Sequence, residues 1–502
     1  MVYRPLSMVC LVIAACGVML SSGAAILISD PSGVTPSSPD YWENSFITIG
    51  RAEVIVNGGT VITQPAGANV TIGSGEDAVG RLTITENARM YTPNSAYVGY
   101  RGGTGIMTIE NGGTWMLGSS MFLGQNEGTT GILSVSTGGT VTVGGLSIGL
   151  SGHGIINISN GGTLVNTSSF TTNLGSGIYS TPAVGVVVVD GAGSNWINNS
   201  AIKIAMGGVS TGSLTVRNGG LVATTGLSAG DGVADLEFDG GVLRAQGAST
   251  NFITGVFNSL KLTGAGMTLE NDQAVTVNQT FTGDGGLRKT GVGTLTLNAK
   301  QEYTGLTVVE SGTLTGTVSL TGGLVVRNGG VFAPGGASKG WQAEVGGFVL
   351  DRGGILALKI GVYRDSLLVD GDVVLDGTLA LSAIGTLRDG DSYALIVNDG
   401  NHPVYGTFST ITVGGASVEW HPVGGLFGGG WFEYKGKTFA ISYGGDASTG
   451  SLYGGRDVVL GVGVDVSVFP PVPPIPEPAT LTLLALGATI IYGCHRGERR
   501  RA

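Results

Sequence analysis

The chain has 502 residues, of which 92 are glycine and only 12% are charged, and its formal net charge is −10. An acidic chain without clustered Lys and Arg lacks the positive surface that phosphate backbones require, so nucleic acid is not an expected partner. Its three cysteines, Cys10, Cys16 and Cys494, lie near the two ends, so the body between them has no disulfide and no thiolate metal site. Abundant glycine with 42% hydrophobic residues indicates a long β-structure with glycine at its corners.

Residues 1–25 are typical of a secretory signal peptide. Arg4 supplies the positive start, and an apolar region follows from Met8 to Leu20. Ala24 and Ala25 close a run of small residues, which is the expected cleavage region. The sequence therefore predicts export through the Sec machinery.

Two alternatives remain open for this segment. The apolar region could stay in place as a membrane anchor, although it is short for that role. The run Ile13-Ala14-Ala15-Cys16 also looks like a bacterial lipoprotein cleavage box, in which Cys16 would carry the lipid. The apolar region continues past Cys16 to Leu20, which favours the signal peptide.

Residues 26–250 predict a β-solenoid with repeats of about 25 residues. Paired apolar residues alternate with polar ones, so each pair shares one face of an extended strand. The equivalent pairs are Leu82/Ile84, Met107/Ile109, Leu133/Val135, Ile156/Ile158, Leu214/Val216 and Leu236/Phe238. Turns such as Asn111-Gly112-Gly113 follow most pairs, because Asn and Gly tolerate left-handed backbone angles. Three short strands per repeat fit one coil of a parallel β-helix, and only a stack of coils can bury the inner faces.

The repeat also resembles a known pattern. The sequence Gly-Ile-Leu-Ser-Val-x-x-Gly-Gly-Thr-Val at 131–141 is similar to a repeat shared by type V secretion passengers and PEP-CTERM proteins. The segment 189–196 leading to 212–216 resembles it as well, and the likeness covers most of residues 50–245. A parallel β-helix is therefore expected from the alternation and from the resemblance.

A second type of repeat is expected in residues 251–340, where it begins near Phe281. The segment 286–297 is followed by Tyr303-Thr304-Gly305-Leu306-Thr307-Val308, and together they are similar to the autotransporter-associated β-strand repeat. Gln301-Glu302 stands where that family usually has a pair containing Asn. The alternation in this segment predicts further coils.

Residues 341–468 continue in a β-rich pattern that resembles the distal part of an autotransporter passenger. Aromatic residues concentrate here, and large side chains suit the covering of an open solenoid end. These residues are Trp420, Phe427, Trp431, Phe432, Tyr434, Phe439 and Tyr443.

The C-terminal segment carries a sorting pattern. Residues 469–475 are a stiff Pro-rich linker, and Pro476-Glu477-Pro478 then precedes an apolar run from Ala479 to Tyr492. The basic end contains Arg496, Arg499, Arg500 and Arg501. Residues 476–502 closely resemble the PEP-CTERM sorting signal, and this resemblance implies processing near Pro476, Glu477 and Pro478 by an exosortase. The run can just cross a bilayer with its arginines on the cytoplasmic side, so a permanent anchor is the alternative.

No catalytic, cofactor-binding or metal-binding residue is expected. His153 lies in a Gly-His-Gly tripeptide that also occurs in polygalacturonases, but their other motifs are absent, and His153 is expected in a loop between coils. Asp365, Asp370, Asp372 and Asp376 could ligate calcium, but they lack the spacing of known calcium loops and are expected at solvated turns. Trp115 has the phase of Val141 and is expected in the core, whereas Trp196 cannot be assigned a face.

The sequence thus favours an exported, non-catalytic β-solenoid at the cell surface or in the extracellular matrix. The resemblance implies an exosortase as partner and an exopolysaccharide setting, with the membrane contacted through the C-terminal helix before processing. An adhesin that binds one glycan or protein is the first alternative. A polysaccharide-cleaving β-helix enzyme is the second, and it requires acidic side chains and a base converging in one groove.

Overall fold

The alternating apolar pairs of the sequence form the inward side of a parallel β-solenoid of about 14 turns in the computed structural model. The structure describes residues 26–29, 42–43, 46–51, 53–57, 61–64, 66–177, 181–335, 340–423 and 428–466. Each turn contributes strands to different sheets, and each strand pairs in parallel with its equivalent in the next turn. The expected all-β parallel solenoid is confirmed, whereas the signal peptide and the C-terminal helix lie outside the described residues.

Two sheets, A and C, run the length of the solenoid. Sheet A contains β1 (Ile26–Ser29), β4 (Glu53–Val56), β7 (Val79–Ile84), β10 (Thr104–Ile109), β13 (Thr130–Val135), β16 (His153–Ser159), β19 (Val184–Asp190), β22 (Thr211–Arg217), β25 (Val233–Asp239), β28 (Ser259–Leu262), β31 (Thr282–Gly283), β34 (Lys300–Tyr303), β37 (Ser319–Leu320), β40 (Gln342–Val345), β43 (Ser366–Val369), β46 (Ser392–Asn398), β50 (His421–Pro422), β51 (Gly430–Tyr434), β52 (Lys437–Gly445) and β53 (Asp457–Val462). Sheet C contains β5 (Val61–Thr63), β8 (Arg89–Thr92), β11 (Thr114–Leu117), β14 (Thr140–Val143), β17 (Thr163–Asn166), β20 (Asn195–Asn198), β23 (Leu221–Thr224), β26 (Gly241–Ala245), β29 (Met267–Asn271), β32 (Leu287–Thr290), β35 (Thr307–Val309), β38 (Leu324–Val326), β41 (Phe348–Leu350), β44 (Val373–Leu375) and β47 (Tyr405–Gly406).

The third side of the solenoid is formed by two successive sheets, B and D. Sheet B contains β2 (Trp42–Glu43), β3 (Phe46–Ile49), β6 (Asn69–Ser74), β9 (Ala96–Tyr100), β12 (Ser120–Leu123), β15 (Gly145–Ile148), β18 (Thr172–Leu174), β21 (Ala201–Ile204), β24 (Gly226–Ala229) and β27 (Ile253–Thr254). Sheet D contains β30 (Val275–Val277), β33 (Thr294–Leu297), β36 (Gly312–Gly316), β39 (Gly330–Pro334), β42 (Ile355–Gly361), β45 (Thr378–Ile384), β48 (Thr410–Val413) and β49 (Ala416–Ser417).

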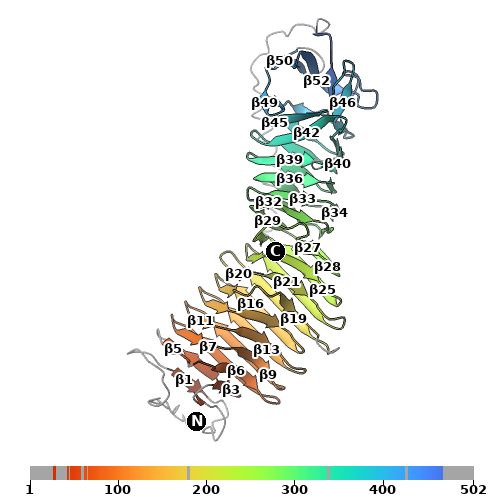
Figure 1. Ribbon diagram of the computed structural model, residues 1–502. Helices are drawn as coiled ribbons and strands as arrows, with labels where there is room; N and C mark the ends of the chain where they lie inside the picture. Colours follow the sequence, from red (N-terminus) through yellow and green to blue (C-terminus); the bar gives the residue numbers. More distant parts are fainter. Residues whose placement is uncertain are drawn as a thin grey trace, which may run out of the picture.

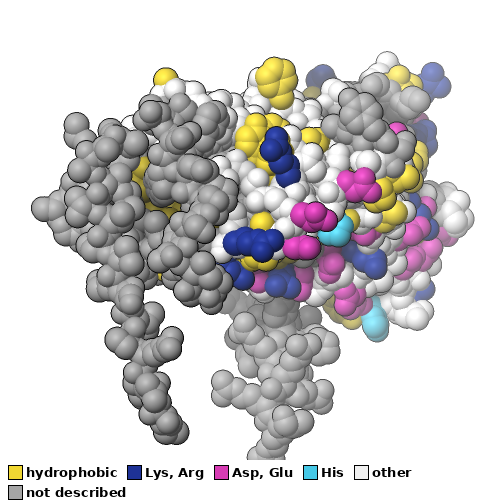
Figure 2. Space-filling model, turned by 90° about the horizontal axis from the view of Figure 1, so that it is seen from below, with side chains coloured by type: hydrophobic (Ala, Val, Ile, Leu, Met, Phe, Trp, Pro, Cys, Tyr) yellow, Lys and Arg dark blue, Asp and Glu magenta, His cyan; other side chains and the backbone are white. Residues whose placement is uncertain are grey.

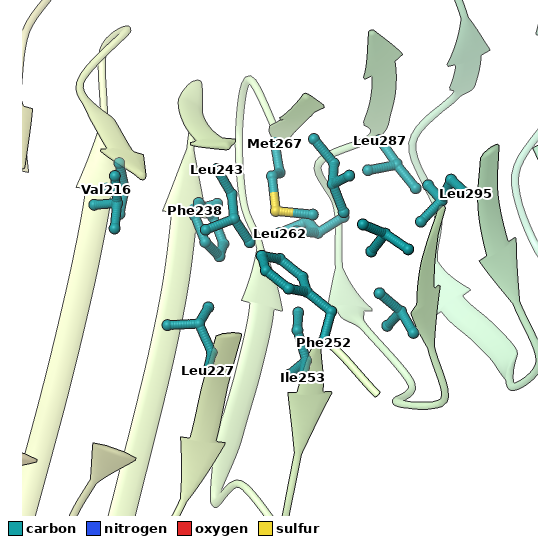
Figure 3. Packing of buried hydrophobic residues seen from close by; sticks show 14 of the residues in the cluster. Val216, Leu227, Phe238, Leu243, Phe252, Ile253, Leu262, Met267, Leu287 and Leu295 are labelled. Atoms are coloured by element: carbon teal, nitrogen blue, oxygen red, sulfur yellow. The ribbon is translucent and has the colours of Figure 1, made fainter. Parts of the chain in front are cut away.

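The solenoid bends where sheet B ends at β27 and sheet D begins at β30 (Figure 1). The first turns after the bend are short, with sheet C partners 20 residues apart at Thr268, Arg288 and Val308, and later turns lengthen again to 24 residues or more, as between Val325 and Val349. The core continues through the bend, where Phe252 packs among aliphatic residues of both parts (Figure 3). Phe252 and Phe281 are both completely buried.

The corners have a steric cause. The predicted left-handed turn after sheet A is present at Asn111 and Gly112, with φ of 48° and 75°. The Val-Gly and Leu-Gly pairs at the end of the sheet B strands mark a second corner, where Gly99 and Gly124 have φ of 75° and 62°. Glycines inside the following sheet A strands pack against this corner. At Gly131 an added Cβ would lie within 2.6 Å of the Gly124 nitrogen and closer still to the Val98 carbonyl oxygen.

Polar side chains inside the solenoid bond to one another at the corner between sheets C and B. Asn166 donates from Nδ2 to Asn198 Oδ1 at 2.9 Å, and Asn198 donates to the Ser200 carbonyl at 2.7 Å. In the next turn Thr224 Oγ1 donates to the same carbonyl at 2.7 Å. These contacts supply the partners that buried amides and hydroxyls require.

Antiparallel strands occur at both ends of the solenoid. At the N-terminal end β1 pairs with β4 and β2 with β3, and at the C-terminal end β53 pairs with β46, followed by β52, β51 and β50. The buried rings of Phe432 and Phe439 stack at 5.1 Å in the C-terminal set. Such strands occupy the open edges that an uncovered solenoid would present.

Candidate interaction surfaces

The outward side of sheet A between β7 and β25 carries three columns of side chains, which we call the sheet A face. Parallel pairing places equivalent residues in register, so each column runs along the solenoid. The central column is Arg81, Ile106, Ile132, Ile155, Val186, Ser213 and Asp235. The flanking columns are Val79, Thr104, Thr130, His153, Val184, Thr211 and Val233, and Thr83, Thr108, Ser134, Asn157, Val188, Thr215 and Glu237.

The middle of this face is uncharged. In β10, β13, β16, β19 and β22 the three columns contain aliphatic, hydroxyl and amide side chains and one histidine. Asp190 and Arg217 lie one position beyond the columns and form an ion pair at 2.9 Å, so their charges compensate. A hydrogen bond from the Asn218 amide lowers the pKa of Asp190 below its usual value, and Arg217 lowers it further. Burial of Asp190 opposes this shift.

An aromatic cluster lies on the outward side of sheet B. The rings of Tyr97 and Phe122, in successive turns, stack at 5.4 Å with an interplanar angle of 9°. Tyr100 lies 5.3 Å from Tyr97, and the Arg101 guanidinium lies 5.1 Å from the centre of the Tyr100 ring. Because Tyr97 and Phe122 stack on each other, the cluster stabilises the packing of neighbouring turns.

Beyond the bend, sheet C carries a second outward column of aliphatic side chains, Val308, Val325, Val349 and Val374. A charged residue follows each valine by two positions, namely Glu310, Arg327, Asp351 and Asp376. Arg327 contacts Glu310 at 3.1 Å, and Arg288 contacts the same carboxylate at 2.9 Å. Burial raises the pKa of Asp351, and the nearby guanidinium of Arg327 opposes that shift. Figure 2, viewed from the N-terminal end, likewise shows acidic and basic side chains interspersed.

The four aspartates that could ligate calcium have different surroundings in the structure. The expectation of a solvated turn is wrong for Asp365, which is 2% exposed and accepts bonds from the Lys359 Nζ at 2.7 Å and the Trp341 backbone nitrogen at 3.0 Å. Asp372 contacts His402 Nδ1 at 2.7 Å, and Asp376 contacts Arg352. The backbone N–H of Asp370 donates to the Val345 carbonyl oxygen at 3.1 Å. Among the residues that the structure describes, no group of three or more His, Cys, Asp or Glu side chains could hold a metal ion.

His153 is not in a loop, contrary to the prediction from its Gly-His-Gly context. It is the first residue of β16, pairs with Thr130 and Val184, and points outward. Trp115 is completely buried opposite Val141, which confirms its expected position, and it donates to Thr92 Oγ1 at 3.0 Å. Trp196 is also completely buried.

Lys289 is a buried cation that the sequence pattern did not reveal. Its side chain points inward from β32 and is 0% exposed. Its Nζ donates to the carbonyl oxygens of Thr290 at 2.7 Å, Gly291 at 2.8 Å and Ser311 at 3.2 Å. Burial lowers the pKa of Lys289 to about 8, and the charge of Asp272 opposes that shift.

The lowered pKa of Lys289 predicts that the free energy of unfolding rises with pH. Its pKa is 10.5 when unperturbed and about 8 in the fold, so at intermediate pH the unfolded chain holds a proton that the folded chain has lost. Between about pH 7 and about pH 9.5 we expect the free energy of unfolding of the wild type to rise by about 2 kcal/mol more than that of Lys289→Met. Urea unfolding of both proteins at the two pH values measures this difference. Parallel pH dependences would contradict it.

Neither a known protein family nor any curated protein matches this chain. The residues predicted to act in export and sorting lie outside the described residues; they are Ala24, Ala25, Pro476, Glu477, Pro478, Arg496, Arg499, Arg500 and Arg501. Within the part of the chain that the structure describes, no helix has the length and hydrophobicity needed to span a membrane.

Proposed function

We propose that this chain is an exported, non-catalytic β-solenoid that presents its repetitive outer faces at the cell surface or in the extracellular matrix. The supporting observation is one unbroken core through about 14 turns, which at about 4.8 Å per turn makes a stiff body roughly 65 Å long. Three of the four aspartates considered as calcium ligands already have side-chain partners, since Asp365 contacts Lys359, Asp372 contacts His402 and Asp376 contacts Arg352. The function is then geometric, because a stiff body holds many weak contact sites at fixed spacing.

The proposal includes processing by an exosortase at Pro476-Glu477-Pro478, from the resemblance of residues 476–502 to the PEP-CTERM signal. We expect the wild type to leave the membrane fraction with an intact mass that lacks the segment after the cleavage point. Glu477→Ala should keep that segment and stay in the membrane fraction. Cell fractionation with intact-mass analysis tests this.

The matched control is Glu419→Ala, which removes an exposed glutamate from the described part of the chain. It should change the mass only by the substitution and leave the location unchanged. If Glu477→Ala and the wild type have the same mature end and the same location, the sorting proposal is wrong.

An adhesin is the second candidate, and the aromatic cluster of Tyr97, Tyr100 and Phe122 with Arg101 favours it. Aromatic rings and a guanidinium are common elements of recognition surfaces. This candidate requires that Tyr100→Ala, at the edge of the cluster, abolish binding to a surface glycan or protein while leaving the fold intact.

A further inference from the structure

The central column of the sheet A face has opposite charges at its two ends. Arg81 lies at one end and Asp235 at the other, with five uncharged positions between them. Among the described residues neither side chain forms an ion pair, although Glu53 lies beside Arg81 in β4. Ile155 is the midpoint of the column.

If the column is read in the opposite direction, each charged end faces the opposite charge of the original column. If a second copy faces the column with its solenoid antiparallel, Arg81 of each copy meets Asp235 of the other. Ile132 then meets Val186, and Ile155 meets Ile155. The flanking column that begins at Val79 and ends at Val233 matches itself in the same way. These two valines, which are 44% and 45% exposed, would then contact each other. A parallel arrangement would instead bring Arg81 against Arg81, which like-charge repulsion disfavours.

The size of the face also fits a pair of identical chains. Seven strands at about 4.8 Å give a length of roughly 34 Å, and six-residue strands give a width of roughly 20 Å. The footprint of roughly 680 Å² is close to the ~800 Å² that each partner contributes to a typical stable interface. Its aliphatic middle and polar flanks match the usual division of such interfaces into an apolar core and a polar rim.

We propose that the sheet A face binds a second copy of this chain, with the two solenoids antiparallel and a two-fold axis along the strands at Ile155. The sheets pack face to face, and the apolar column excludes water between the copies. The exchange of Arg81 and Asp235 sets the register and direction. The association is independent of export and sorting, so it can fail or succeed separately from the proposed function.

Cross-linking of the full chain tests the geometry, because the body contains no native cysteine. A short thiol-reactive cross-linker that spans the ~10 Å between packed sheets should join Ile155→Cys to its own copy. Thr140→Cys is the matched control, because it points outward from sheet C in a neighbouring turn. Arg81→Cys and Asp235→Cys should each give no cross-linked dimer alone. The double variant should cross-link, because Cys at position 81 of one copy then faces Cys at position 235 of the other. All variants keep Cys10, Cys16 and Cys494, so any background is shared.

Charge reversal tests the pairing in solution, with sedimentation of the full chain in a mild detergent. Arg81→Asp and Asp235→Arg should each weaken the dimer by about tenfold or more, and the double variant should restore it. Ile155→Glu should give a folded monomer, because the side chain points outward and does not enter the core. A wild type that stays monomeric at tens of micromolar overturns the proposal. Failure of the double variant to recover, or a monomer whose sheet A face binds a neutral polysaccharide instead, also overturns it.

Discussion

Replacing Gly131 by alanine is expected to lower the free energy of unfolding by about 4 kcal/mol or more, which is exceptional for one methyl group. The added Cβ would lie 2.6 Å from the Gly124 nitrogen, 2.8 Å from Leu123 Cα and closer still to the Val98 carbonyl oxygen. These are backbone atoms of two preceding turns, and Gly124 donates to Val98 at 2.9 Å. The clash therefore cannot be relieved by a side-chain rotation, and relief requires breaking the pairing between turns.

Gly208→Ala is the matched control, because no atom lies within 4 Å of the added Cβ and the backbone there is not left-handed. We expect it to be neutral or to stabilise by about 0.4–1 kcal/mol, since alanine restricts the unfolded chain. Denaturant unfolding of the two variants measures the contrast. A Gly131→Ala protein with the midpoint of Gly208→Ala would mean that the corner is not packed as described.

The local features of the fold could be predicted because their causes are local. Leu133 and Val135 point inward because side chains alternate along a strand, and Asn111-Gly112 turns because both residues accept left-handed angles. The tight packing of Gly131 is different. The sequence shows that a glycine recurs, but only the fold shows which carbonyl it faces.

The outer surface could not be predicted in the same way, because the turns differ in length. Ile132 and Ile155 are 23 residues apart, whereas Ile155 and Val186 are 31 apart, yet all three lie in one column. A fixed period therefore misaligns the column and hides the relation of Arg81 to Asp235. Register follows from the inward apolar pairs and from the corners, and the loops absorb the difference in length.

The same limit explains Lys289 and His153. A lysine within an alternating pattern is usually read as exposed, and Lys289 is buried only because three carbonyl oxygens from two turns surround its ammonium group. From the sequence alone, His153 is expected in a loop between coils, because no positioned partner for acid–base chemistry can be named for it. In the fold Gly154 occupies the close-packed glycine position of a sheet A strand, so β16 extends back to His153.

The sequence predicts a change of repeat type at residue 251 but not the bend itself, and the Phe252 ring is central to packing there. Sheets A and C pass through it, whereas sheet B stops at β27 and sheet D starts at β30. On the third side only a short stretch of backbone pairing joins the two parts, including a bond from the Phe252 nitrogen to the Thr276 carbonyl oxygen at 2.9 Å, so side-chain packing must supplement it. Phe252 fills this place, completely buried beside Ile253, Leu262 and Met267 (Figure 3). Truncation would leave a cavity that the continuous sheets on the other two sides prevent from collapsing.

We therefore expect Phe252→Ala to lower the free energy of unfolding by about 3–5 kcal/mol. Phe170→Ala is the control, because the Phe170 ring is 83% exposed and its loss should cost less than about 0.5 kcal/mol. Amide exchange adds a second measurement, in which β27 and β30 should lose protection while β13 and β16 keep theirs. Equal stabilities for the two variants would show that the core does not run continuously through the bend. In that case the two parts of the solenoid would unfold independently, and a stiff body of fixed shape would no longer support the proposed function.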